Sequence, residues 1–358
     1  MTFDVSLKAW LALSLTRGLG GESARRLLKE FGSPDAVFAA SISSLKSVVK
    51  ADIAAEISKG IADDVIAPAL AWLEDGNNHI VTLADSDYPQ ALLNIPDPPL
   101  LLYVKGRLDL LNRSALAIVG SRSATPQGIN NAEAFAKSLS DAGLCIISGM
   151  AHGIDAAAHR GALRGQGSSI AIVGTGLDKV YPAANRDLAH ALAQQGALIS
   201  EFPLGTPPLA ANFPRRNRLI SGMSLGCLVV EASLQSGSLI TARLALEQGR
   251  DVFAIPGSIH APQSKGCHAL LKQGAKLVET AQDILEELGG LLVSPAQGAN
   301  SEGPDSALLE HLGFDPVDVD TLSVRCGLTI AELSAMLLTL ELNGRICVLP
   351  GGLYQRIH

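Results

Sequence analysis

Several features are scarce in this chain. Its five cysteines are scattered without a CxxC pair, an odd number that fits neither a disulfide framework nor a zinc finger. It has no run of about 18 uncharged apolar residues, and its N-terminus, MTFDVSLKAW, lacks the basic and apolar regions of a signal peptide. These absences predict a protein of the reducing cytoplasm that neither crosses a membrane nor is exported.

Apolar residues are abundant, at 47% of the 358 residues, whereas charged residues make up 18%. A chain of this composition buries a sizeable core and is not a disordered polymer. At about 150 residues per domain, its length predicts two or three domains.

The charge balance is unevenly distributed. The whole chain has a net charge of −7, which argues at first sight against a nucleic-acid partner. The excess of acid lies in the flanks, since residues 1–83 hold 8 basic and 10 acidic side chains and residues 302–358 hold 3 and 8. Residues 84–276 hold 17 basic and 13 acidic side chains, so the middle of the chain is mildly basic.

Residues 1–80 are expected to form a small helical domain, because apolar residues such as Leu7, Trp10 and Leu11 recur at helical spacing. The stretch LTRGLGGESARRLL predicts two helices joined by a glycine turn. Arg25 and Arg26 just beyond that turn would offer charge to a DNA backbone. A purely structural helical hairpin is the alternative.

Residues 81–288 are expected to form one α/β domain. Four prolines first confine regular structure to short pieces, and buried strands then alternate with helices. The expected strands are 115–120, 144–149, 169–174, 197–202, 225–232, 251–257 and 276–279. Near-continuous apolar runs joined by helices are typical of a Rossmann-like, doubly wound, mainly parallel sheet.

Residues 289–304 have the composition of a linker, and residues 305–358 are expected to form a winged helix, with short helices followed by a hairpin. The helix expected at Thr329–Asn343 carries Glu332 and Glu341 but no Lys or Arg. Because DNA phosphates would repel it, we interpret this domain as a protein-interaction or packing module. A chain that acts mainly as an interaction hub is one hypothesis that follows.

Glycine and serine cluster after four of the expected strands, where parallel sheets bind ligands. The four turns are Gly120-Ser121-Arg122-Ser123, Ser148-Gly149, Gly174-Thr175-Gly176 and Ser236-Gly237-Ser238. Each alone is compatible with a simple tight turn. Together, at one sheet edge, they predict a phosphate-binding surface.

The common nucleotide fingerprints are missing. Gly174-Thr175-Gly176 continues with Leu177-Asp178-Lys179, so the third glycine of GxGxxG is absent, and the chain contains no GxxxxGK[ST] motif. We therefore expect no nicotinamide cofactor and no P-loop ATPase, and we predict no cofactor at all.

The segment from Phe202 to Val230 is expected to be a charged loop with three arginines and no acid. Arg215, Arg216 and Arg218 beside Asn217 supply forked donors for phosphates, and Phe213 offers a ring for base stacking. The alternative is that one or two of these arginines hold carboxylates of their own domain.

Two other constellations suggest different chemistry. His152, Asp155 and His159 would share a helix face as metal ligands do, but a helix packed on the sheet, with Asp155 in its first turn, is the favoured interpretation. Glu231 is the best candidate for a catalytic acid, and we expect it instead to pair with an arginine such as Arg243.

A long ordered set of motifs resembles the DNA processing protein A family (DprA/Smf). It runs from about Ser86 to Glu279 and includes AIVGSRSATPQG, IISGMAHGIDAAAHRGAL, VGTGLDKVYPAANRDL, FPRRNRLISGMS and VVEASLQSGSLITARLALEQGRDVFAIPG. The flanking helical and winged-helix regions also fit this family.

The resemblance implies a non-enzymatic, sequence-independent single-stranded DNA-binding protein. In competent cells, such a protein protects incoming strands and loads the RecA recombinase during natural transformation and recombination. The resemblance also implies a homodimer. The candidate DNA-binding residues are Arg122, Ser148, Gly149, Lys179, Phe213, Arg215, Arg216, Asn217, Arg218, Gly237 and Ser238. The alternative is a Rossmann-like nucleotide-processing enzyme that resembles the phosphoribohydrolases.

Overall fold

The computed structural model describes residues 5–289, 308, 311–312, 317–342, 346–349 and 353–356. Contacts divide the chain into two units, Met1–Leu292 and Val293–His358. Among the described residues, no helix is long and apolar enough to cross a membrane.

The N-terminal segment is helical, as the sequence predicts. Its helices are α1 (Val5–Leu15), α2 (Gly21–Phe31), α3 (Pro34–Ala39), α4 (Ile42–Lys46), α5 (Ala51–Lys59) and α6 (Asp63–Trp72). The side chains of Ser33 and Ser41 cap α3 and α4 by accepting hydrogen bonds from the backbone N–H groups of Ala36 and Ser44. Trp10, Leu13 and Leu27 are buried in the core of this segment.

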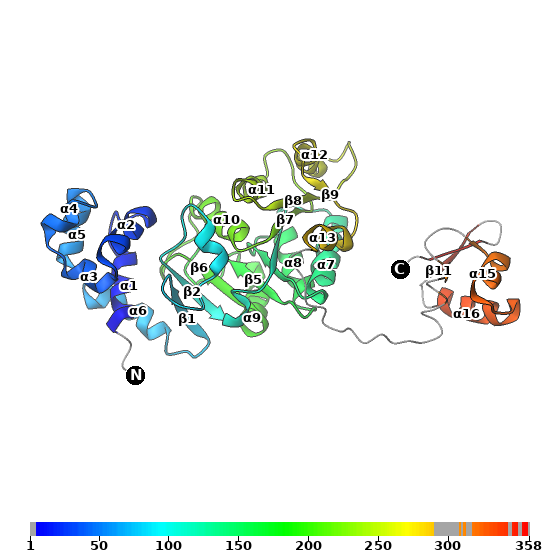
Figure 1. The fold of residues 1–358 in the computed structure, drawn as a ribbon, viewed down its shortest axis with the longest axis horizontal. Helices are drawn as coiled ribbons and strands as arrows, with labels where there is room; N and C mark the ends of the chain where they lie inside the picture. Colours follow the sequence, from blue (N-terminus) through cyan, green and yellow to red (C-terminus); the bar gives the residue numbers. More distant parts are fainter. Residues whose placement is uncertain are drawn as a thin grey trace. The chain divides into compact units, whose positions relative to one another are not determined.

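A nine-stranded sheet forms the centre of the first unit (Figure 1). Its strands are β1 (Asn78–Thr82), β2 (Leu101–Gly106), β3 (Ala115–Val119), β4 (Cys145–Ser148), β5 (Ser169–Ile172), β6 (Ala197–Ser200), β7 (Gly226–Val229), β8 (Asp251–Ala254) and β9 (Lys276–Leu277). They lie in the order β1-β2-β6-β5-β4-β3-β7-β8-β9, and only the β1–β2 and β2–β6 pairs are antiparallel. The predicted Rossmann-like sheet is confirmed, and each expected strand contains one of these.

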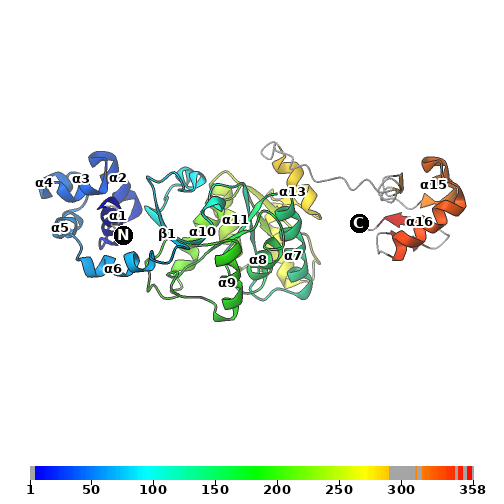
Figure 2. The same cartoon turned by 90° about the horizontal axis from the view of Figure 1, so that it is seen from below.

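Helices cover both faces of the sheet. They are α7 (Pro126–Asp141), α8 (Ile154–Ala162), α9 (Arg186–Gln195), α10 (Asn212–Gly222), α11 (Ser238–Glu247), α12 (Lys265–Lys272) and α13 (Ala281–Leu288). Short 3-10 helices span Gln90–Asn94, Leu108–Leu110, Ala183–Asn185 and Pro262–Ser264. Strand β3 alternates between two cores, since Leu116 and Ile118 pack with α7, α8 and α13, and Ala117 packs on the side of α10, α11 and α12. Figure 2 shows α7 and α13 side by side.

The strand order reverses at β3. From β3 the chain passes through β4 and β5 to β6 on one side, and then returns to β7, β8 and β9 on the other. A doubly wound sheet opens a crevice where its order reverses, beyond the carboxyl ends of the strands. This places the crevice between the loops that follow β3 and β7.

The second unit contains β10 (Val317–Asp318), α15 (Val319–Cys326), α16 (Ile330–Leu342), β11 (Ile346–Leu349) and β12 (Leu353–Arg356). Its three strands lie in the order β10-β12-β11, and β11 and β12 form the expected hairpin. Leu322, Leu333 and Leu337 lie in its core. The helix predicted from Thr329 is α16, and Thr329 donates its N–H and hydroxyl to the Glu332 carboxylate. The linker expected at residues 289–304 lies, apart from its first residue, outside the described residues.

Candidate functional site

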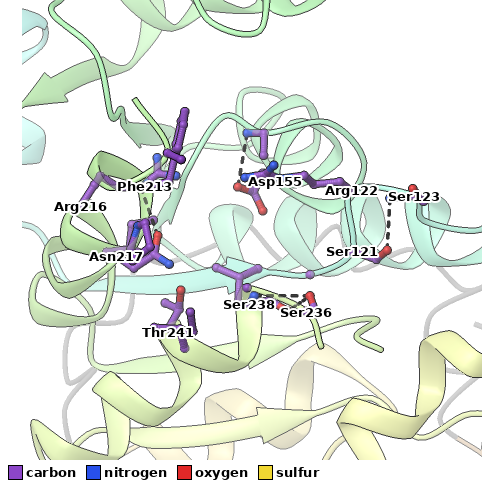
Figure 3. A pocket seen from close by; sticks show the side chains of 18 of the residues that line it. Ser121, Arg122, Ser123, Asp155, Phe213, Arg216, Asn217, Ser236, Ser238 and Thr241 are labelled. Atoms are coloured by element: carbon purple, nitrogen blue, oxygen red, sulfur yellow. Dashed lines mark hydrogen bonds between the residues drawn. The ribbon is translucent and has the colours of Figure 1, made fainter. Parts of the chain in front are cut away.

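A cavity of about 650 Å³ occupies the crevice between the loops after β3 and β7 (Figure 3). Its walls also include the N-terminal parts of α10 and α11. Of the eleven candidate DNA-binding residues, six line it: Arg122, Phe213, Arg216, Asn217, Gly237 and Ser238. The fold thus brings together two glycine turns and one arginine-rich segment that lie far apart in the sequence.

The glycine turns make one wall of the cavity. Gly120 has no space for a side chain, because a Cβ there would lie 2.6 Å from Ile154 Cγ1 and 2.9 Å from the Glu231 carbonyl oxygen. In the other turn, the hydroxyls of Ser236 and Ser238 lie 2.7 Å apart (Figure 3). Gly237 between them faces open space, so this turn is accessible to a ligand at the start of α11.

Arg122 is the most available cation of the cavity. It is exposed, and no described residue forms an ion pair or a hydrogen bond with its guanidinium. The guanidinium forms a cation–π contact, since its carbon lies 5.7 Å from the centre of the Phe213 ring. A phosphate that enters the cavity would find five free N–H donors here.

The expected arginine loop is partly wrong, because Asn212–Gly222 forms helix α10. Helical geometry sends its three arginines in different directions. Arg216 points inward and is only 4% exposed. Its Nη1 donates to the backbone oxygens of Gly149, at 2.8 Å, and Ile172.

The buried position of Arg216 has two consequences. Burial lowers its pKa to about 10, although Asp155 opposes the shift. Its Nε donates to Asn217 Oδ1 at 3.2 Å, which orients the carboxamide of Asn217 at the cavity wall. Arg216 therefore supports the cavity from inside, and its best donors are already used.

Arg215 and Arg218 lie away from the cavity, on the side of α10 that faces Glu201. Arg218 Nη2 is 2.5 Å from Glu201 Oε2 and 3.5 Å from Asp97 Oδ2, and Arg215 Nη2 is 3.3 Å from the same Glu201 oxygen. Burial raises the pKa of Glu201, and the two arginines oppose this shift. Arg215 and Arg218 therefore hold carboxylates of their own domain, as the alternative interpretation of the sequence expected.

The other three candidates also lie outside the cavity lining. Ser148 donates its hydroxyl to the Ile118 carbonyl at 2.6 Å, and the N–H of Gly149 donates to Asp155 Oδ2 at 3.2 Å. Gly149 has its own reason to be glycine, since a Cβ there would lie 2.7 Å from Arg216 Nη2. Lys179 is exposed and donates to the Gly205 carbonyl at 2.6 Å.

The metal alternative finds no support in the described part of the chain, where no group of three potential ligands occurs. Asp155 lies in the first turn of α8, as expected, and accepts the N–H groups of Gly149 and Ala151. His159 is fully buried against Ser169, with Nδ1 2.7 Å from the hydroxyl oxygen, and burial lowers its pKa to about 3. It remains neutral at physiological pH.

The expected pairing of Glu231 with Arg243 is wrong. The Glu231 carboxylate instead accepts the N–H of Thr125 at 2.9 Å and its hydroxyl at 2.5 Å, at the start of α7. A carboxylate is stabilised there by the helix dipole. Gly128 permits this approach, since a Cβ on it would lie 2.4 Å from Glu231 Cδ.

Arg25 in the N-terminal segment also has a structural role. It donates to Asp97 at 3.0 Å and to the carbonyl oxygens of Pro96 and Pro98 at 3.0 and 2.9 Å. These contacts tie α2 to the loop before β2 and support the scaffold interpretation for this side chain.

Tyr181 and Thr241 line the cavity but were not among the candidates from the sequence. Tyr181 is 44% exposed, and its ring centre lies 5.6 Å from that of Phe213. Thr241 lies on α11, facing the side of Asn217 (Figure 3). The position of Tyr181 shortly after the Gly174-Thr175-Gly176 turn was the available signal.

The fold and the cavity define a Rossmann-like protein with a crevice at its strand switch point. Residues 79–289 match the model of the DNA recombination-mediator protein A family, and residues 293–352 match the DprA winged-helix domain. The chain belongs to this DprA/Smf family.

Three relatives illustrate the similarity. The Smf protein of Escherichia coli is 47% identical over 303 residues, which cover 82% of this chain and 81% of that protein. The crystal structure of DprA from Streptococcus pneumoniae gives a TM-score of 0.70 at 37% identity, covering 80% of this chain and 99% of that one. DprA from Helicobacter pylori, solved to explain its mode of single-stranded DNA binding, gives 0.54 at 31% identity and covers 59% of this chain and 96% of its own.

Proposed function

We propose that this protein binds single-stranded DNA without sequence preference, and that the cavity between β3 and β7 is where the strand docks. The observation that carries this proposal is the guanidinium of Arg122, which no described residue pairs with, in a cavity that also offers a glycine-serine turn and aromatic rings. The single-stranded DNA binding of the Helicobacter pylori relative supports it.

The chemistry of the walls suits a strand. Arg122 and the turn Ser236-Gly237-Ser238 offer N–H and O–H donors to phosphates, and Phe213 and Tyr181 offer rings to bases. Phosphates and ring faces are common to all nucleotides, so this set of contacts contains no base code. Duplex DNA hides its base faces, and the site should therefore prefer single strands.

The proposed function is non-enzymatic. Glu231, the best candidate for a catalytic acid, uses both carboxylate oxygens to bind Thr125. It is therefore engaged in holding the start of α7. Incubation of the protein with nucleoside monophosphates tests this point, because release of free base would indicate the phosphoribohydrolase-like alternative.

We further propose that the protein acts in the cytoplasm as a homodimer that loads RecA onto strands during natural transformation. Exposed apolar side chains support self-association, since Leu234 and Ile259, which follow β7 and β8 in the chain, are 65% and 66% exposed. Light scattering of wild type and Leu234→Glu tests the dimer. RecA filament formation on strands coated with a single-strand-binding protein tests the loading.

The direct test of the proposed function is fluorescence anisotropy with an oligothymidine strand and a duplex of equal length, at several salt concentrations. We expect tighter binding of the strand, with an affinity that falls as salt rises. Equal affinity for strand and duplex, or an affinity that is independent of salt, would contradict the proposal.

A further inference from the structure

Two aromatic rings line the cavity, and they differ in the surface that they offer. Tyr181 is 44% exposed, whereas Phe213 is half-buried. Their ring centres are 5.6 Å apart and their planes are inclined by 41°. At this distance the rings are in contact, so no base fits between them.

Phe213 is already engaged on several sides. The Arg122 guanidinium lies over its ring at 5.7 Å. The ring also packs against the turn after β5, since a Cβ on Gly174 would lie 3.1 Å from Phe213 Cδ1. The ring with the larger free surface at this cavity is therefore that of Tyr181.

Nothing in the described part of the chain holds the hydroxyl of Tyr181, which has no hydrogen-bond partner there. The Tyr181 ring itself contacts the ring of Phe213. In proteins that bind single strands, exposed aromatic rings beside phosphate-binding groups stack on bases.

We propose that Tyr181 is a base-stacking residue in its own right, which binds an unpaired base beside the one at Phe213. This inference rests on the proposed binding of single-stranded DNA. It assigns the base contact to the loop after β5 as well as to α10, so two segments whose rings touch would hold neighbouring bases.

The competing interpretation is that Tyr181 only supports the ring of Phe213. The two are separated by the variants Tyr181→Ala, Phe213→Ala and the double variant, with Tyr181→Phe to keep the ring and remove the hydroxyl. Val180→Ala is the matched control, because Val180 is the adjacent residue, is 37% exposed and does not line the cavity. Thermal unfolding of each variant checks that the fold is intact.

The probes are an oligothymidine strand and an abasic strand of equal length. We expect Tyr181→Ala to weaken oligothymidine binding by about tenfold, while Tyr181→Phe and Val180→Ala bind as wild type does. On the abasic strand, Tyr181→Ala should bind as wild type does, because no base is present to stack. The double variant should bind oligothymidine more weakly than Phe213→Ala alone.

Two results would overturn the inference. One is an equal loss on both strands for Tyr181→Ala, and the other is a double variant that binds no more weakly than Phe213→Ala. Failure of the wild-type protein to bind oligothymidine would instead overturn the proposed function, so the two failures are distinguishable.

Discussion

The salt dependence of strand binding should separate the arginine that contacts phosphate from those that serve the fold. Each phosphate contact on a single strand contributes about −0.7 to the slope of log affinity against log salt. Arg122 lines the cavity and forms no ion pair with the residues that the structure describes, whereas Arg218 is held by the buried Glu201 carboxylate at 2.5 Å. Arg122→Ala should therefore reduce the slope by about 0.7, and Arg218→Ala should leave it unchanged.

The two variants should also differ in affinity and stability. Arg122→Ala should lower affinity about tenfold at low salt without changing the urea midpoint, since one charge-assisted contact is lost. Arg218→Ala should lower the free energy of unfolding, because it leaves the Glu201 carboxylate without its closest partner.

The assay is anisotropy with an oligothymidine strand at four or more salt concentrations. Arg113→Ala is the matched control, because it removes one positive charge from a surface pair with Asp109 outside the cavity. A slope change for Arg218→Ala as large as that for Arg122→Ala would refute this division of roles.

Three further predictions concern side chains with structural roles. Arg216→Met should lower the free energy of unfolding by about 3 kcal/mol in urea titrations, because the Gly149 and Ile172 carbonyls lose their donor; an unchanged midpoint contradicts this. Neutral His159, with a pKa of about 3 in the fold and 6.5 in the unfolded chain, should favour folding fully above pH 6.5. That stability is lost as pH falls toward 3, by up to about 1.4 kcal/mol per pH unit. The free energy of unfolding of His159→Gln should fall less steeply with pH, and equal pH profiles of the variant and wild type would contradict this prediction. Glu231→Gln should cost about 1 kcal/mol of stability and leave strand affinity unchanged, whereas weaker binding would implicate Glu231 in the site.

The alternation of apolar strands with helices was enough to predict the doubly wound sheet. Strand β3 shows why, since all five of its residues are buried and they alternate between two cores. A strand that is apolar throughout must be covered on both faces, which a parallel sheet with helices on both sides achieves. The glycine turns at Gly120 and Gly237 could be assigned to one edge for the same reason.

The roles of the three neighbouring arginines could not be separated by composition alone. Arg215 and Arg218 are three residues apart and share a side of α10, whereas Arg216 points toward the sheet. Had the segment been recognised as a helix, this spacing would have divided them. The carboxylate that they meet, Glu201, is brought there by β6, and only the tertiary fold shows that distance.

Glu231 illustrates the same limit. Sequence proximity suggested Arg243 as its partner, but its carboxylate binds Thr125, more than a hundred residues earlier in the chain. Strands β3 and β7 are neighbours in the sheet, so the segments that follow them meet. Pairing across a topological switch depends on strand order, which apolar periodicity does not encode.

The measurement that tests the central claim most directly is photo-cross-linking of the wild-type chain to a strand that contains 5-iodouracil, followed by mass spectrometry of the linked peptides. If the cavity between β3 and β7 is the docking site, cross-links should fall on the peptides that carry Tyr181 and Phe213. They should decrease when unlabelled oligothymidine competes. Cross-links confined to the N-terminal helices or to the winged-helix unit would contradict the account.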